Sequence, residues 1–106
     1  MANQFKLIYK ILSILEKAMD YEEFDTHCLN HEALGISFPL WCRLMKMLVD
    51  NGYITGVSIL HPMETSYPKA MLGKVEITLE GLEYLEENSL MAKAKNLAKG
   101  TLELIK

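Results

Sequence analysis

The stretch LVDNGYITGV, residues 48–57, limits the possible folds more than any other part of the chain. It ends an amphipathic helical pattern, because Asn51-Gly52 supplies the left-handed residue that closes a helix. Residues 53–60 then carry the β-branched side chains of a strand. A helix must therefore pass directly into a strand. The apolar residues before the break recur at the spacing of one buried helix face: Trp41, Leu44, Met45 and Leu48.

A second strand is predicted at residues 74–79, where Val75, Ile77 and Leu79 alternate inward with polar neighbours. The residues between the two strands, 61–73, include two prolines and one glycine, which are typical of a loop. We therefore expect two antiparallel strands joined by a long loop, a hairpin that follows the helix immediately.

Two helices are predicted near the start of the chain. The first covers residues 3–18, with Asn3 as its cap. Tyr21 and Phe24, in the acidic segment that follows this helix, are expected to pack inward. A short helix at 31–34 is expected to end at Gly35. The apolar stripe of the first helix combines Phe5, Leu7, Ile8, Ile11, Leu12 and Leu15.

The helix at 37–51 has clear start signals. Ser37 is a good N-cap, and Pro39 fits the first turn, where no N–H is needed. The side opposite the buried face is expected to be exposed, and it carries Cys42, Arg43, Lys46, Met47 and Asp50.

Thr78 is expected to cap a helix over residues 79–89. A separate final helix is expected to follow it over residues 89–106. We divide the chain accordingly into a domain at 1–88 and a C-terminal helix at 89–106, which packs on the domain or mediates a homodimer. The apolar positions of that final helix are Leu90, Met91, Ala94, Leu97, Ala98, Leu104 and Ile105.

This order of elements predicts an α+β fold of winged helix-turn-helix type, in which the two-stranded wing folds beside the third helix. Two motifs, LVDNGYITGV and VEITLEGLEYLEEN, resemble the pattern of small bacterial winged-helix regulators. From residue 3 to about 106 the chain resembles the YjcQ-like family of small winged-helix proteins of Gram-positive bacteria and their phages. The resemblance implies DNA binding, inferred from the fold, and a role as a transcriptional regulator, with a phage as one source.

A winged helix that binds DNA lays its third helix in the major groove, while the wing touches the backbone or the minor groove. Arg43 suits guanine, and Lys46 and Lys69 suit phosphates. The alternative is that Arg43 and Lys46 simply solvate a helix face. The predicted DNA-binding residues are Ser37, Arg43, Lys46, Tyr67, Lys69 and Lys74.

A module that binds another protein, without DNA, is the second hypothesis. The first turn of the helix is SFPL, with Phe38 and Leu40 where polar residues would usually meet bases. Together with Met47, Met63 and Met71 they form either an adaptable binding surface or ordinary packing. The net charge of −3 also favours this hypothesis, although residues 37–79 hold four basic and three acidic residues.

We expect no enzyme, cofactor or metal site. The chain has no serine elbow, Gly-rich phosphate loop or zinc-protease motif. His27, Cys28 and His31, with Cys42 as a further ligand, match no complete zinc pattern and are interpreted as a chance cluster. With two unpaired cysteines, charges in the N-terminal apolar run and no apolar run long enough to span a membrane, we expect a cytoplasmic protein.

Overall fold

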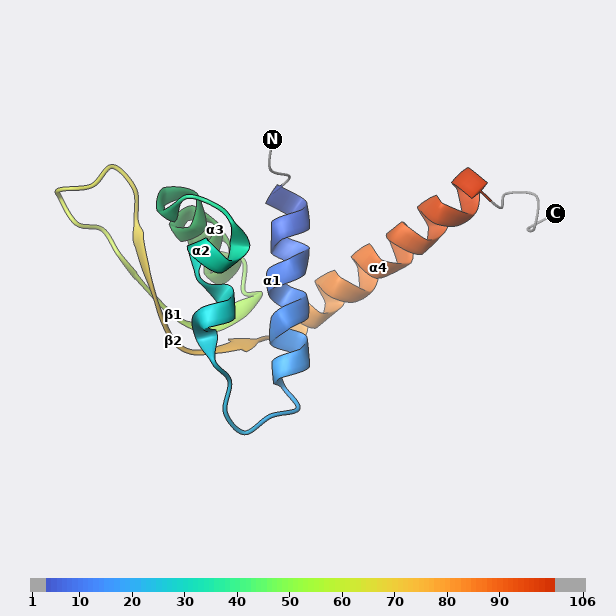
Figure 1. The fold of residues 1–106 in the computed structure, drawn as a ribbon, viewed down its shortest axis with the longest axis horizontal. Helices are drawn as coiled ribbons and strands as arrows, with labels where there is room; N and C mark the ends of the chain where they lie inside the picture. The colour runs from blue at the N-terminus through green and yellow to red at the C-terminus, as the bar shows by residue number, and fades with distance from the viewer. Residues whose placement is uncertain (1–3, 101–106) are drawn as a thin grey trace.

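The computed structural model describes the backbone of residues 4–100 and the side chains of residues 4–89. Four helical segments, one of them a 3-10 helix, precede a two-stranded antiparallel hairpin, and one long helix follows it (Figure 1). This order confirms the predicted α+β fold with a winged-helix arrangement. The elements are α1 (Gln4–Ala18), the 3-10 helix η1 (Thr26–Leu29), α2 (His31–Leu34), α3 (Phe38–Asp50), β1 (Ile54–Leu60), β2 (Lys69–Ile77) and α4 (Leu79–Gly100).

The core forms where α1, α3 and the hairpin meet. The predicted inward face of α3 is confirmed, since Trp41, Leu44, Met45 and Leu48 are all buried. Trp41 also donates from Nε1 to the carbonyl of Leu29, 2.6 Å away, and so ties α3 to η1. The other buried side chains are Ile11, Leu12, Leu15, Leu29, Leu34, Cys42, Ile54, Ala70, Val75, Ile77 and Leu85.

The helix boundaries follow from the local signals. Ser37 caps α3, where its Oγ accepts from the N–H of Leu40 at 3.3 Å. Gly35 and Gly52 adopt φ values of 72° and 75°, the left-handed region, directly after α2 and near the end of α3. The three predicted boundaries are therefore confirmed.

The hairpin extends closer to its tip than predicted. Leu60 pairs with Lys69, so β2 begins at Lys69 and the loop spans 61–68 rather than 61–73. The pairing continues because both prolines of the segment, Pro62 and Pro68, lie outside the strands. We call β1, β2 and the loop between them the wing.

The hairpin bends at Gly56. Between the pairs Thr55↔Glu76 and Val57↔Leu72, Gly56 alone stands opposite the three residues 73–75. Its φ is 86°, and a Cβ there would lie 1.9 Å from the carbonyl oxygen of Lys74. Only glycine fits this bulge, which turns the base of the hairpin toward α1.

Several predicted side-chain positions are wrong. Phe5 is 73% exposed, because the buried side chains of α1 lie beyond its first two turns. Tyr21, in the loop after α1, is 71% exposed. Cys42 is fully buried rather than exposed, since the hairpin covers that side of α3 and the N–H of Ala70 points at Cys42 Sγ, 3.4 Å away. Phe24 does pack on the core, as predicted.

The end of the second strand and the break in the last helix are also wrong. β2 stops at Ile77, and Leu79 is the first residue of α4, 68% exposed. α4 continues through residues 88–89 without interruption. Asn88 donates to the carbonyl of Tyr84 at 2.8 Å, a bond within the helix at the predicted break. Asn3, Leu104 and Ile105 lie outside the described residues, as do the side chains from 90 onward.

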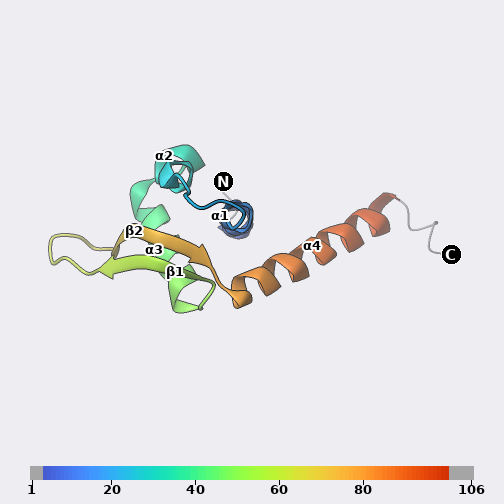
Figure 2. The same ribbon diagram turned by 90° about the horizontal axis from the view of Figure 1, so that it is seen from below.

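α4 contacts α1 near its start and then runs away from the rest of the molecule (Figures 1 and 2). The division into a domain at 1–88 and a helix at 89–106 stays a prediction. Within the described part of the chain, no helix has both the length and the apolar character that a membrane span requires.

The bend at Gly56 gives a stability prediction. We expect Gly56→Ala to lower the free energy of unfolding by more than about 2 kcal/mol, because the new methyl group would overlap the Lys74 carbonyl. Gly52→Ala is the control, since it shares the positive φ but has open space around the Cβ; we expect a loss of about 1 kcal/mol. Chemical denaturation measures both, and equal losses would contradict the close approach at Gly56.

Candidate nucleic-acid interface

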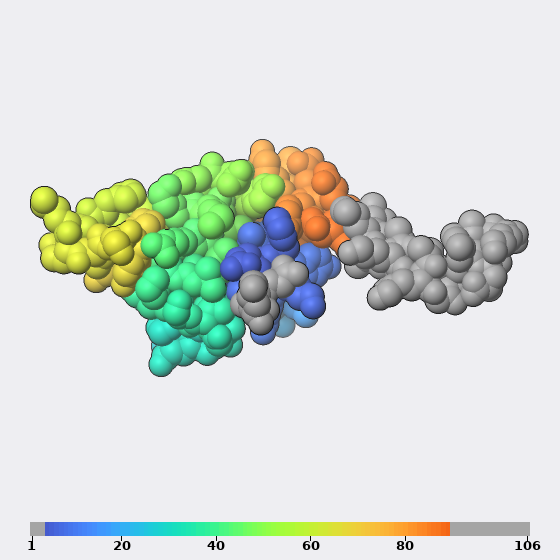
Figure 3. Space-filling model, turned by 90° about the horizontal axis from the view of Figure 1, so that it is seen from above, coloured from blue at the N-terminus to red at the C-terminus, as the bar shows by residue number. Residues whose placement is uncertain are grey.

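One side of α3 is not covered by the rest of the described chain. Arg43, Met47 and Asp50 are exposed there, and Leu40 is half-buried. The wing lies directly beside α3 at the end of the molecule opposite α4 (Figure 3). The uncovered side of α3 and the tip of the wing are therefore presented together, and we call them the α3–wing surface.

An aromatic cluster holds the wing tip against the start of α3. The ring of Phe38 stacks on Trp41 at 5.8 Å between centroids and meets Tyr67 of the wing edge-on at 6.2 Å. His31 contacts the same Phe38 ring from α2 at 5.3 Å. Phe38 is thus a partly buried packing residue that joins three elements, whereas the protein-binding hypothesis places it on the contact surface.

Arg43 is the positively charged residue of this surface that is best placed to bind an anion. Its guanidinium carbon lies 5.9 Å from the centroid of the Tyr67 ring, which orients the side chain toward the wing. Among the described residues no carboxylate lies within ion-pairing distance of Arg43. Its charge and its hydrogen-bond donors are therefore available to an anionic partner.

The three lysines predicted to bind DNA are placed less favourably. Lys46 is one turn beyond Arg43, and it forms an ion pair with Asp50 at 2.5 Å. Lys69 is half-buried at the start of β2, two residues after Tyr67. Ser37, the sixth predicted residue, uses its hydroxyl to cap α3. The structure thus brings together Arg43 and Tyr67. Ser37 lies at the start of α3, and Lys69 faces the same side of the hairpin as its pairing partner Leu60.

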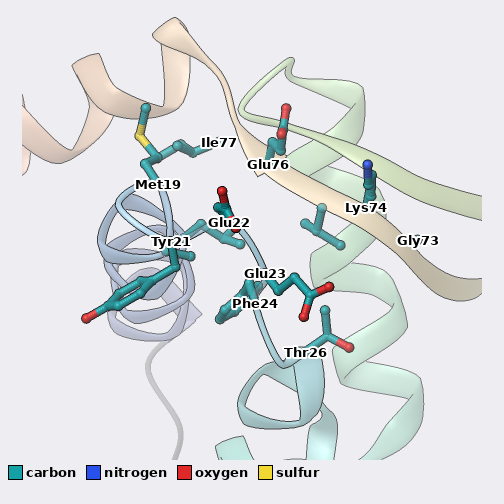
Figure 4. Close-up of a pocket in the computed structure, with 13 residues that line it drawn as sticks. Met19, Tyr21, Glu22, Glu23, Phe24, Thr26, Gly73, Lys74, Glu76 and Ile77 are labelled. Carbon is teal, nitrogen blue, oxygen red and sulfur yellow. The ribbon is translucent and has the colours of Figure 1, made fainter.

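Lys74 lies in a different environment. It lines a pocket of about 570 Å³ between the end of α1, the segment 19–26 and the base of β2. Figure 4 shows Lys74 on β2 across from Glu22 and Glu23, with Glu76 further along the strand. Three carboxylates and one ammonium group give this pocket a negative character, which does not suit phosphate.

Apolar side chains are exposed on the outer face of the wing. Met63 at the tip is 98% exposed, and Leu60 and Met71 are exposed on the strands. Because Leu60 pairs with Lys69, Leu60 and Met71 are diagonal neighbours on the same face. Sequence reasoning picked out Met63 and Met71 but missed Leu60, which an alternating pattern places outward.

The residues considered for a metal do not form a site in the described part of the chain, where no three His, Cys, Asp or Glu side chains converge. Cys28 is exposed, and Cys42 is buried between α3 and β2. The backbone N–H and the ring of His27, at 3.0 and 2.7 Å, hold the pKa of the Asp25 carboxyl below its usual value. Asp25 thereby caps η1.

Two features of the surface were missed from the sequence. The Lys46–Asp50 pair has the i, i+4 spacing that signals an ion pair along a helix, so it could have been found. The contact between Phe38 and Tyr67 joins residues far apart in the chain and leaves no local signal.

The fold and the α3–wing surface define a small α+β protein of winged-helix type. The chain belongs to the YjcQ family, because the family model described as YjcQ protein matches residues 9–104, nearly its whole length. Neither the curated proteins nor the solved structures compared with the chain gave a significant match.

Proposed function

We propose that this YjcQ-family protein binds duplex DNA through the α3–wing surface and acts as a transcriptional regulator. The observation that carries the proposal is Arg43, which is exposed, has no carboxylate partner among the described residues and is oriented by Tyr67 beside the wing. A helix next to a wing fits the major groove of B-DNA. Arg43 contacts a guanine edge or a phosphate, both of which a guanidinium binds with two hydrogen bonds.

The proposed interface makes few charged contacts. Lys46 is partly neutralised by Asp50, Lys69 lies on the outer face of the wing with Leu60, and Lys74 faces the acidic pocket. Arg43 is therefore the main cation. Leu40 and Met47 give the rest of the uncovered side of α3 an apolar character, which suits contact with thymine methyl groups. Binding should therefore weaken with salt, but with the modest slope of a few phosphate contacts.

The first prediction concerns Arg43. We expect Arg43→Ala to weaken the affinity for DNA about tenfold and, if Arg43 contacts a phosphate, to reduce the salt slope by about 0.9. Fluorescence anisotropy with labelled duplexes from the region upstream of the gene, at two salt concentrations, measures both effects. Lys10→Ala on α1 removes an equal charge away from the surface and should change neither. Equal binding by wild type and Arg43→Ala would refute this site.

The second prediction is a gain in DNA affinity rather than a loss. Asp50→Asn removes the partner of Lys46 and a negative charge from the uncovered side of α3, so we expect DNA to bind several-fold more tightly. The same anisotropy assay measures this gain. Asp20→Asn, which removes an exposed carboxylate just beyond the end of α1, should leave the affinity unchanged. A loss of affinity in Asp50→Asn would mean that α3 does not face the phosphates.

A protein-binding role is the second candidate, favoured by the exposed apolar side chains of the wing. Leu60 and Met71 are adjacent on the outer face of the wing, and Met63 extends from its tip. Methionine-rich surfaces of this kind adapt to protein partners. This role predicts no DNA binding at low salt in the anisotropy assay.

For this second candidate we expect Met71→Glu to abolish retention of a partner from a cell extract on the immobilised protein. Met71→Leu keeps the size and apolar character of the side chain, and should retain the partner. Met47→Glu tests α3 in the same way, and is preferable to Phe38→Glu, which would disrupt the aromatic cluster. Quantitative mass spectrometry of the retained proteins distinguishes these variants, and equal retention by Met71→Glu and Met71→Leu would exclude the outer face of the wing.

A further inference from the structure

The first half of α4 is covered on one side only. Leu85 is buried, Gly81 sits against the carbonyl of Tyr53 and the side chain of Ile77, and the ring of Tyr84 lies 5.2 Å from that of Tyr53. Beyond this contact α4 runs away from the rest of the molecule (Figures 1 and 2). The helix therefore has a covered side at its start and a long remainder that leaves the body of the protein.

The opposite side of α4 begins with an exposed leucine. Leu79, Glu83 and Glu86 are all exposed. Leu79 and Glu83 lie on the side turned away from Gly81 and Leu85. Glu86 lies at the edge of that side, where it lines a shallow groove between α4 and α1. The four-and-three spacing of Leu79, Glu83 and Glu86 continues along the sequence to positions 90, 93 and 97. In the sequence these three positions are Leu90, Lys93 and Leu97.

The charges on α4 are segregated. Residues 80–87 contain four glutamates and no basic residue, whereas residues 93–99 contain three lysines and no acidic residue. The helix dipole favours acidic residues in the first turn and basic residues in the last turn only. Glu86 and Glu87 lie beyond the first turn, so the dipole does not account for the whole acidic block.

We propose that this outer side of α4 pairs antiparallel with α4 of a second copy of the chain. In one symmetric register Leu79 faces Leu97 of the second copy, Glu83 faces Lys93, and Glu86 faces Leu90. The four-and-three spacing is that of paired helices, and each contact occurs twice around the two-fold axis. A parallel pair would instead oppose Glu83 to Glu83 and Lys93 to Lys93. Charge complementarity therefore identifies the partner of this side of α4 as a second copy of the chain. This identification does not depend on what the α3–wing surface binds.

Charge-reversal variants of the whole chain test this pairing, because the mass of the protein in solution shows whether it is a dimer. Sedimentation equilibrium should give a dimer, twice the chain mass of 12.1 kDa. Glu83→Lys and Lys93→Glu should each weaken the dimer about tenfold or more, since each replaces two attractive pairs by two like-charge pairs. The double variant with both changes restores the attraction and should dimerise as the wild type does. Lys95→Glu changes the same charge at a position outside this four-and-three spacing and should have no effect.

A cysteine pair tests the direction of the helices without relying on charge. In a Cys28→Ser background, Leu79→Cys combined with Leu97→Cys should form a disulfide-linked dimer on mild oxidation, whereas Leu79→Cys alone should not. Circular dichroism confirms that each variant keeps its helices. A wild-type monomer at all concentrations, a dimer insensitive to both single charge reversals, or ready cross-linking of Leu79→Cys alone would overturn the proposal.

Discussion

The junction at Thr78 determines how the rest of the structure is oriented. Its hydroxyl donates to the carbonyl of Gly52 and accepts from the N–H of Gly81, and its own N–H donates to the carbonyl of Tyr53. The end of α3, the start of β1, the end of β2 and the start of α4 therefore meet at one side chain. Because Gly81 has no Cβ, α4 can approach the Tyr53 carbonyl closely enough for this junction to form. One residue thus sets the direction of both the wing and the long helix.

From that junction the wing is held at two further points. The bulge at Gly56 bends its base toward α1, and the rings of Phe38 and Tyr67 fix its tip against the start of α3. Arg43 consequently lies over an aromatic ring that is already in position. A surface arranged before binding loses less conformational entropy when a partner binds, so even a few contacts at this surface can contribute to affinity.

The sequence predicted those features that depend on neighbouring residues. Ser37, Gly35, Gly52 and Thr78 act within one or two turns, and the helix starts and ends that they mark were correctly identified. Cys42 was misplaced because the hairpin that buries it arrives from residues nearly thirty positions later. Tyr21 looked like a core residue by its type, but no element packs over it. The prediction of the candidate surface was incomplete for the same reason. The contact of Tyr67 with Phe38 and the position of Lys74 in the acidic pocket both depend on residues far apart in the chain.

The proposed pairing through α4 would strengthen the proposed binding of DNA by the α3–wing surface. A single α3–wing surface offers Arg43 as its main cation, which allows only a small number of phosphate contacts for one protein molecule. Two copies joined through α4 would present two such surfaces to one duplex, and the second contact would form at a high effective concentration once the first has formed. α4 leaves the body at the end opposite the wing, so a partner held there would not cover either surface. Pairing through α4 would therefore raise the affinity that the proposed DNA-binding surface could reach with so small a basic patch.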